Sequence, residues 1–232
     1  FGCGAGHSTF ALVLEGGICT GIDISEASIL NACEKRKEYF ENYGIFINRE
    51  GEIVDQYLLI SKSLNRPITN VVFMGMGEPF LNYTNVIKAA NLLHDPNGIN
   101  LGYKRITIST AGIVKRIEQF SKERQKFKLA ISLNGTTNAQ RLSIMPVTKN
   151  NPLENLLNVS DNYTSSLNTW ITFEYVLIKD CNDDLSDADR LITILSGINK
   201  CKLNVIPYNM TDGIFQRPDE QQIKLFMKKL NN

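Results

Sequence analysis

The chain has 232 residues, of which 43% are hydrophobic and 21% are charged, as in an ordinary globular protein. Its 25 lysines and arginines nearly balance its 24 aspartates and glutamates, so net charge does not indicate a nucleic-acid or membrane partner. The sequence has no run of about 18 apolar residues. It also lacks a basic, apolar leader, so we expect neither a membrane span nor a signal peptide.

Cysteine usage and the start of the chain give two further expectations. The five cysteines, at positions 3, 19, 33, 181 and 201, are odd in number and scattered. This predicts free thiols in a reducing cytoplasm rather than a disulfide framework. The sequence opens with Phe1 instead of methionine, which indicates a fragment or a processed start.

Residues 1–44 predict a glycine-rich turn, an apolar helix, a short strand and a second helix. FGCGAGHSTFALVLEGG contains the turn and the apolar helix, and ICTGIDIS predicts a strand that ends in Asp23. Ser25 is a suitable N-cap for the second helix, which stops at Gly44 because glycine favours helix ends.

From residue 46 the chain predicts a regular alternation of strands and helices. Strands are expected at about 70–74, 105–110, 128–133, 171–178 and 202–208. Helices are expected at about 50–64, 84–94, 112–122, 152–160, 186–197 and 218–230. The strands are almost continuously apolar, as in RITIST and KLAISL, which is typical of a parallel sheet covered by helices. The prediction is an α/β fold, either an open or partial barrel or a doubly wound sheet.

Short polar residues follow each predicted strand. The first strand runs into Gly77-Glu78, and later strands end near Ser109, Ser132-Leu133-Asn134 and Asn209. Taken singly, such residues are explained as turns or helix caps. Because parallel strands deliver their carboxyl ends to one edge, together they predict a ligand site. Glu78 suits an ammonium group, Gly77 permits close backbone approach, and the serines and Asn209 suit ribose hydroxyls or a carboxylate.

Six stretches in this part carry a resemblance to a known family. They are NVVFMGMGEPFLNY, RITISTAGIV, LAISLNGTTNAQRLSIMPV, PLENLL, TFEYVLIKDCND and LNVIPYN. Their order and spacing over about residues 46–232 closely resemble the radical-SAM adenine-C2 methyltransferases of ribosomal and transfer RNA, the RlmN/Cfr family. GEIVDQYLL at 51–59 resembles the segment that follows the iron–sulfur loop of that family.

The resemblance implies a partial (βα)-barrel that binds S-adenosyl-L-methionine (SAM). Gly77 and Glu78 match the motif for the SAM amino group. The other positions that match residues lining SAM are Ser109, Ser132, Leu133, Asn134 and Asn209. Asn134 stands where many members have histidine. The implied chemistry is reductive cleavage of SAM at a [4Fe–4S] cluster, followed by methyl transfer through a cysteine to adenine C2.

The sequence departs from the family at its cysteines. A cluster loop of the form C-x3-C-x2-C is expected just before GEIVDQ, but EYFENYGIFINRE stands there. The methyl-carrying cysteine of the family is expected in a segment after residue 232. Cys181 and Cys201 match neither catalytic cysteine and are interpreted as small buried side chains. We therefore assign no catalytic and no metal-binding residues.

The first stretch resembles a different family, the class I (Rossmann-like) SAM-dependent methyltransferases. Gly2, Gly4 and Gly6 match its glycine turn, and Asp23 matches the acidic residue that binds the ribose hydroxyls. The alternative is a tight turn between a strand and a helix. The predicted domains are therefore a truncated class I fragment at 1–45 and a radical-SAM-like partial barrel at 46–232, joined without a linker.

Three functions remain open at this point. The first is an enzyme of the adenine-C2 methyltransferase type that is inactive as given. The second is a non-catalytic SAM- or RNA-binding remnant of a chimeric reading frame. The third is a class I methyltransferase fragment. A natural protein whose first unit completes the barrel is the alternative to a chimera. The expected partners are ribosomal and transfer RNA, which Arg141, Asp180, Asn182 and Asp183 could contact by resemblance. A cytoplasmic monomer is expected.

Overall fold

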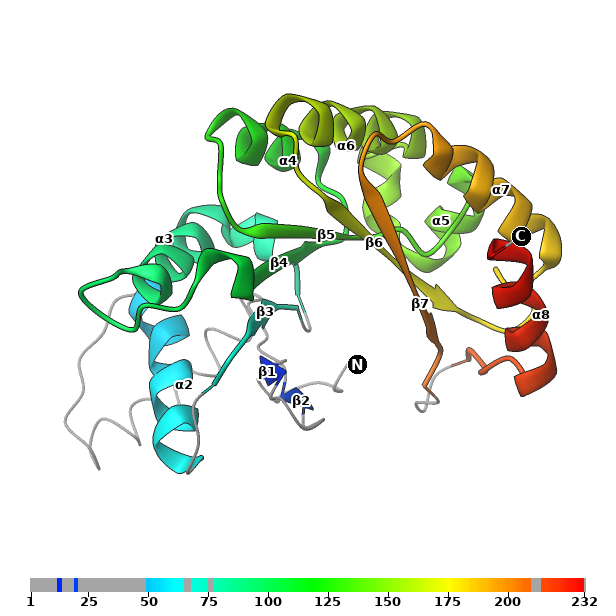
Figure 1. The fold of residues 1–232 in the computed structure, drawn as a ribbon. Helices are drawn as coiled ribbons and strands as arrows, with labels where there is room; N and C mark the ends of the chain where they lie inside the picture. The colour runs from blue at the N-terminus through cyan, green and yellow to red at the C-terminus, as the bar shows by residue number, and fades with distance from the viewer. Residues whose placement is uncertain are drawn as a thin grey trace. The chain divides into compact units, whose positions relative to one another are not determined.

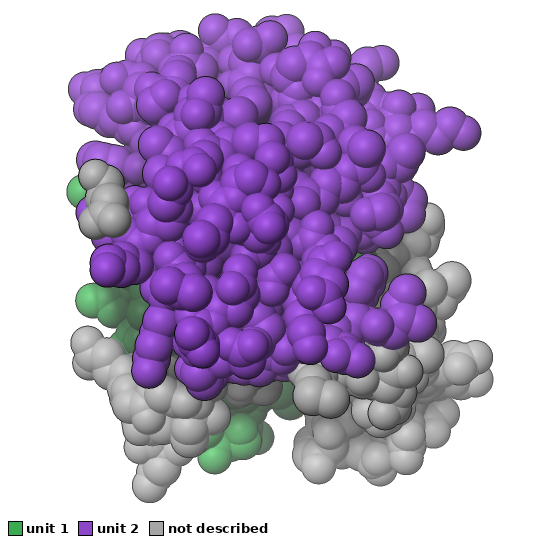
Figure 2. Space-filling view, turned by 90° about the vertical axis from the view of Figure 1, so that its right-hand side faces the viewer, with its two compact units in different colours: residues 1–110, 126–128 green, residues 111–125, 129–232 purple. Residues whose placement is uncertain are grey.

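The computed structural model describes residues 12–13, 19–20, 49–64, 68–74, 77–209 and 214–231. The chain forms two compact units (Figure 2). Unit 1 comprises residues 1–110 and 126–128, and unit 2 comprises residues 111–125 and 129–232. None of the helices in the described ranges is long and apolar enough to cross a lipid bilayer.

A five-stranded parallel sheet forms the centre of the fold, with its strands in the order β3-β4-β5-β6-β7 (Figure 1). The strands are β3 (Val71–Phe73), β4 (Ile106–Thr110), β5 (Lys128–Ser132), β6 (Ile171–Leu177) and β7 (Cys201–Pro207). Spatial order equals chain order, so each strand is followed by a helical crossover and then by its neighbour. All five predicted strands are present within one or two residues.

Unit 1 contains strands β3 and β4 and helices α2 (Arg49–Ser63) and α3 (Tyr83–His94). Val71 pairs with Ile106 and Phe73 with Ile108, and all four side chains are fully buried. Burial on both strands gives this unit an apolar centre. Two short 3-10 helices, η1 (Pro79–Asn82) and η2 (Tyr103–Arg105), precede α3 and β4.

Unit 2 contains β5 from Leu129 onward, β6 and β7, with most of the helices. The helices are α4 (Val114–Lys122), α5 (Asn138–Ile144), η3 (Pro146–Asn150), α6 (Leu153–Leu167), α7 (Leu185–Ser196) and α8 (Glu220–Leu230). In Figure 1, α4, α6 and α7 lie over the same face of these strands. Strand β6 is buried along most of its length, whereas β7 is half-exposed, as expected of an edge strand.

Two predictions about secondary structure were wrong. Leu12–Val13 forms strand β1, which pairs antiparallel with β2 (Cys19–Thr20), where an apolar helix was predicted. The intervening sequence contains Gly16-Gly17, and such a pair favours a hairpin. Helix α6 continues to Leu167, beyond the predicted end near 160, and stops at Asn168, which has the left-handed φ of 51°.

Helix α5 and the 3-10 helices η1, η2 and η3 were not predicted. Helix α5 is only seven residues long, too short for a periodic apolar pattern to be distinct. It is capped by Thr137, whose side chain accepts a hydrogen bond from the Gln140 backbone. The predicted helix from Ser25 to Gly44 and the join near residue 45 lie outside the described residues.

Candidate functional site

The carboxyl end of β3 presents Gly77 and Glu78. Gly77 has a φ of 105°, a backbone conformation that residues with a Cβ rarely adopt. Glu78 is the N-cap of η1, and its Oε1 accepts a hydrogen bond from the Phe80 backbone at 2.9 Å. The same oxygen accepts a 2.7 Å bond from the Thr110 hydroxyl. These two donors fix the direction of the carboxylate.

Ser109 and Thr110 end strand β4, next to β3 in unit 1. Their exposed fractions are 4% and 2%, so both hydroxyls are inside the protein. Ser109 was predicted as a site residue and Thr110 was not, although both stand at the end of β4. Gly77, Glu78, Ser109 and Thr110 thus form the polar end of the two strands of unit 1.

In unit 2, β5 ends in Ser132 and is followed by Leu133 and Asn134. Leu133 is fully buried, and its backbone N–H donates to Glu174 O at 2.8 Å. Asn134 has a φ of 51°, and its Oδ1 accepts a 2.9 Å bond from the Val176 backbone. Its Nδ2 lies 3.4 Å from the sulfur of Met145. The Asn134 amide therefore joins the end of β5 to β6.

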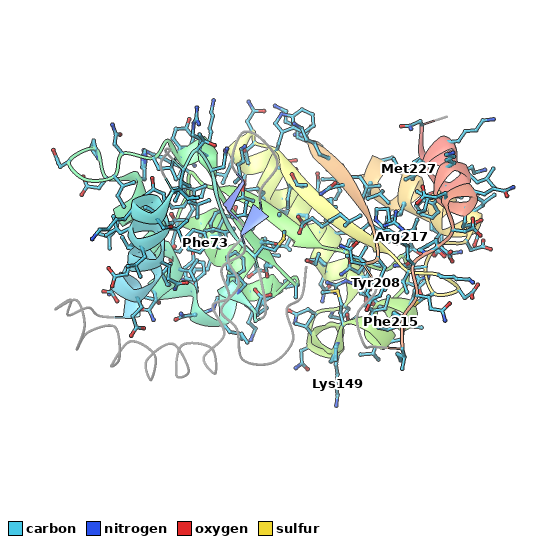
Figure 3. All side chains as sticks on the ribbon, turned by 90° about the horizontal axis from the view of Figure 1, so that it is seen from below. Phe73, Lys149, Tyr208, Phe215, Arg217 and Met227 are labelled. Carbon is cyan, nitrogen blue, oxygen red and sulfur yellow. The ribbon has the colours of Figure 1, made fainter. Side chains whose placement is uncertain are left out.

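Strand β7 is followed by Tyr208 and Asn209. The Tyr208 backbone donates to Leu177 O at 3.0 Å, while Asn209 is exposed. The rings of Tyr208 and Phe215 lie edge to face, with 6.1 Å between their centroids (Figure 3). The exposed amide of Asn209 thus follows a strand end that is hydrogen-bonded to the end of β6 through Tyr208.

Asn182 is a buried residue that was expected to contact RNA by resemblance and was not predicted to organise the strand ends. Its side chain is 0% exposed. Its Oδ1 accepts from the Ile178 backbone at 2.6 Å, and its Nδ2 donates to Asn134 O at 2.9 Å and to Val176 O at 2.8 Å. The side chain therefore satisfies main-chain groups at the ends of β5 and β6.

Burial bears on the residues that could contact RNA by resemblance. Arg141 and Asn182 are both 0% exposed, and both bond to main-chain oxygens inside unit 2. Neither side chain reaches the surface, so a direct contact with RNA is excluded in this conformation. Asp180 remains exposed, and Asp183 is 7% exposed.

An acidic pocket opens beside these residues in unit 2. The residues that line it are Lys179, Asp180, Cys181, Asp183, Asp184, Asp187, Asp219 and Gln222. Burial raises the pKa of the Asp183 carboxyl, and the neighbouring Asp180 and Asp184 add to the rise. A pocket with five aspartates repels phosphate groups, so it does not favour RNA at this position.

The two cysteine side chains that the structure describes, Cys181 and Cys201, are too few to hold a [4Fe–4S] cluster. Three thiolates close together are needed to hold such a cluster, and no C-x3-C-x2-C occurs in the 232 residues. Burial raises the pKa of the Cys181 and Cys201 thiols, which disfavours the thiolate form that binds iron. Cys3 and Cys33, with Gly2, Gly4, Gly6 and Asp23, lie outside the described residues, and only the backbone of Cys19 is described.

Comparison with curated proteins gives close relatives over most of the chain. A protein of Leptospira biflexa named "Probable dual-specificity RNA methyltransferase RlmN" is 43% identical over 179 residues, covering 77% of this chain and 51% of the relative. A protein of the same name from Leptospira interrogans is 44% identical over 179 residues, covering 77% and 50%. The chain thus spans about half the length of the curated relatives that it matches. No protein-family model matches the chain.

Comparison with solved structures gives a radical SAM methyltransferase. A radical SAM methyltransferase from Sphaerobacter thermophilus superposes with a TM-score of 0.75 at 36% sequence identity, covering 78% of this chain and 54% of that one. The predicted resemblance and the predicted parallel α/β fold of the radical-SAM type are confirmed by these relatives.

Proposed function

We propose that this chain, whose matched part is homologous to the radical-SAM RNA methyltransferases named RlmN, is a SAM-binding module of an RNA adenine-C2 methyltransferase. The observation that carries this proposal is the 43% identity over 179 residues to a relative with that name. Identity at this level over so long a stretch implies a common fold. The radical SAM methyltransferase neighbour, with a TM-score of 0.75, supports the same ligand class.

Within unit 1, we assign the SAM ammonium to Glu78. A carboxylate is a strong acceptor for an ammonium group, and Phe80 and Thr110 hold its Oε1 at 2.9 and 2.7 Å. A side chain fixed in advance loses little conformational entropy when the ligand arrives. The lack of a side chain at Gly77 leaves the backbone beside Glu78 open to the ligand. Ser109 supplies a hydroxyl on the neighbouring strand.

Within unit 2, we assign the remaining SAM contacts to Ser132, Leu133, Asn134 and Asn209, as the family resemblance implies. Leu133 and Asn134 would act through the shape and main chain of their loop, because the Asn134 Oδ1 already accepts from Val176. Asn209 offers an exposed side-chain amide for ribose hydroxyls or the SAM carboxylate.

The RNA substrate and the radical reaction belong to the family-level proposal. Transfer of a methyl group to adenine C2 of ribosomal and transfer RNA requires a [4Fe–4S] cluster to cleave SAM. Since the sequence contains no cluster loop, we propose that these 232 residues bind SAM without cleaving it. We also propose a cytoplasmic monomer with a domain boundary near residue 45, which is the expected junction of the class I-like fragment with the barrel.

Isothermal titration of the chain with SAM tests the proposal. The matched variants are Glu78→Gln, which removes the charge, and Glu118→Gln, which removes a charge from the exposed surface of α4. We expect Glu78→Gln to weaken SAM binding about tenfold or more, because a hydrogen bond to a charged group is lost. Glu118→Gln should bind like the wild type. If the wild type does not bind SAM, the proposal is wrong.

Asp23→Asn distinguishes the class I alternative. If SAM binding depends on Asp23 and not on Glu78, the ligand is held by the first 44 residues and the assignment above is wrong. Anaerobic reconstitution with iron and sulfide tests the cluster separately. We expect no stoichiometric iron, and a bound cluster with its charge-transfer absorption would contradict the proposed inability to cleave SAM.

A further inference from the structure

Helix α5 carries an arginine on its inner side. Arg141 is 0% exposed, although arginine is rarely fully buried without a compensating partner. Burial lowers the pKa of its guanidinium to about 10, so the group stays charged at neutral pH. Among the described residues no carboxylate pairs with it.

Four neutral oxygens take the place of a carboxylate. Nε donates to Leu133 O at 2.9 Å, and Nη1 donates to the hydroxyl of Thr148 at 3.1 Å. Nη2 donates to Ala111 O at 2.5 Å and to Ser132 O at 3.1 Å. The three carbonyls belong to the backbone that follows β4 and that ends β5. The fork of an arginine is the only side chain able to supply these donors in one plane.

The surrounding backbone leaves room for this side chain. A Cβ at Gly112 would lie 3.0 Å from Nη2 of Arg141, and a Cβ at Gly135 would lie 2.9 Å from its backbone nitrogen. Gly112 also has a φ of 102°, which residues with a Cβ rarely adopt. Gly112 therefore leaves room for the guanidinium, and Gly135 lets the loop after β5 lie close to the backbone of α5 at Arg141.

The residue of η3 that contacts Arg141, Thr148, also lies inside the protein. Thr148 is 4% exposed and accepts from Arg141, whereas its neighbour Lys149 points away from the protein body (Figure 3). The buried guanidinium thus holds η3 as well as the two loops. Loss of this cation would leave several buried carbonyls without donors, which is costly.

We propose that Arg141 is a positioning residue that holds the Ser132–Asn134 loop and the Ala111–Gly112 turn in the shape that binds SAM. The inference rests on the proposed function, because that loop contains residues assigned to SAM. Arg141 acts through the main chain and does not touch the ligand. It therefore influences the affinity for SAM by setting the conformation that the Ser132–Asn134 loop has before SAM binds.

Hydrogen–deuterium exchange and SAM titration on the full chain test this role together. The variants are Arg141→Met, which removes the donors, Arg141→Lys, which keeps the charge without the fork, and Thr148→Val, which removes one acceptor. Leu191→Ala on α7 is the control, because Leu191 is fully buried, its loss creates a cavity, and it takes no part in the hydrogen bonds of Arg141.

In Arg141→Met and Arg141→Lys, the backbone amides of residues 111–113 and 132–135 should exchange about tenfold faster than in the wild type. The affinity for SAM should fall about tenfold. Thr148→Val should change both in the same direction by a smaller factor and serves as the folded variant if the others do not fold. Leu191→Ala should lower the unfolding temperature without selective exchange in these loops and with unchanged affinity.

The outcomes separate the two proposals. If the wild type does not bind SAM, the proposed function fails, and the exchange rates alone then decide the role of Arg141. If Arg141→Lys behaves like the wild type, charge suffices and the positioning role is overturned. Unchanged loop exchange in Arg141→Met, or loss of affinity in Leu191→Ala equal to that in Arg141→Met, would overturn it as well.

Discussion

The side-chain nitrogen of Asn182 lies 2.9 Å from the main-chain oxygen of Asn134, and both residues lie 48 positions apart in the chain. Through this bond the loop after β6 holds the loop after β5. Asn182→Ala removes this donor and leaves main-chain groups of Ile178 and Val176 unsatisfied as well. We expect a loss of about 2–4 kcal/mol in the free energy of unfolding. Urea unfolding measures it, and Asn204→Ala, an exposed position on β7, should change the free energy by less than about 0.5 kcal/mol.

Thr110→Val tests the orientation of the Glu78 carboxylate. The substitution keeps the shape of a side chain that is 2% exposed and removes its 2.7 Å hydrogen bond to Glu78. We expect a loss of about 1 kcal/mol in stability. SAM binding should weaken by a factor of about three to ten. A variant with lower stability and unchanged SAM affinity would show that Thr110 does not orient the carboxylate for the ligand.

Gly112→Ala should destabilise the protein by about 1–3 kcal/mol. The alanine would have to adopt a φ of 102°. Its Cβ would lie 3.0 Å from Arg141 Nη2 and from both methyl groups of Leu156. Gly102→Ala is the matched control, because nothing lies within 4 Å of a Cβ there and its φ is −57°. Thermal unfolding followed by circular dichroism compares the two, and equal unfolding temperatures would contradict the prediction.

Stability should respond to pH through Asp183. Burial raises the pKa of its carboxyl above the ordinary value of 3.8, so the folded state holds this proton more tightly than the unfolded state. The resulting stabilisation is present below 3.8 and is lost as pH rises through the raised folded pKa. Asp183→Asn should therefore gain stability relative to the wild type between about pH 4 and 7.

The comparison for Asp183 is made by urea unfolding at several pH values. Asn204→Ala, at an exposed position on β7 that carries no titratable group, should differ from the wild type by an amount that stays constant with pH. If the free energy of unfolding of Asp183→Asn differs from that of the wild type by the same amount at every pH, the prediction for Asp183 is wrong.

Cys181 should react slowly with iodoacetamide near neutral pH. Burial raises the pKa of its thiol, and the nearby carboxylates of Asp187 and Asp183 raise it further. Because the thiolate is the nucleophile, alkylation of the folded protein should be at least about tenfold slower than alkylation in urea, and should speed up above about pH 9. Peptide mass spectrometry measures both rates. Rapid alkylation at neutral pH would identify an activated thiol and reopen a catalytic role.

Much of the fold could be predicted from the sequence. The parallel strands are almost continuously apolar, and their helices have regular spacing, because burial of apolar surface imposes those patterns locally. The polar residues after each strand could also be found, since strand ends are visible in the chain order. The stretch from Asn70 to Tyr83 in particular carries the family resemblance without any knowledge of contacts.

The roles of the polar side chains were decided only by the tertiary structure. Sequence allowed Arg141 to contact RNA, but the fold surrounds its guanidinium with four oxygens from segments up to 30 residues away. Asn134 was expected to face a ligand, yet its Oδ1 accepts from β6. Whether a polar group is buried depends on partners that distant elements bring to it, because an unsatisfied buried group is too costly to persist. No local pattern in the chain encodes those partners.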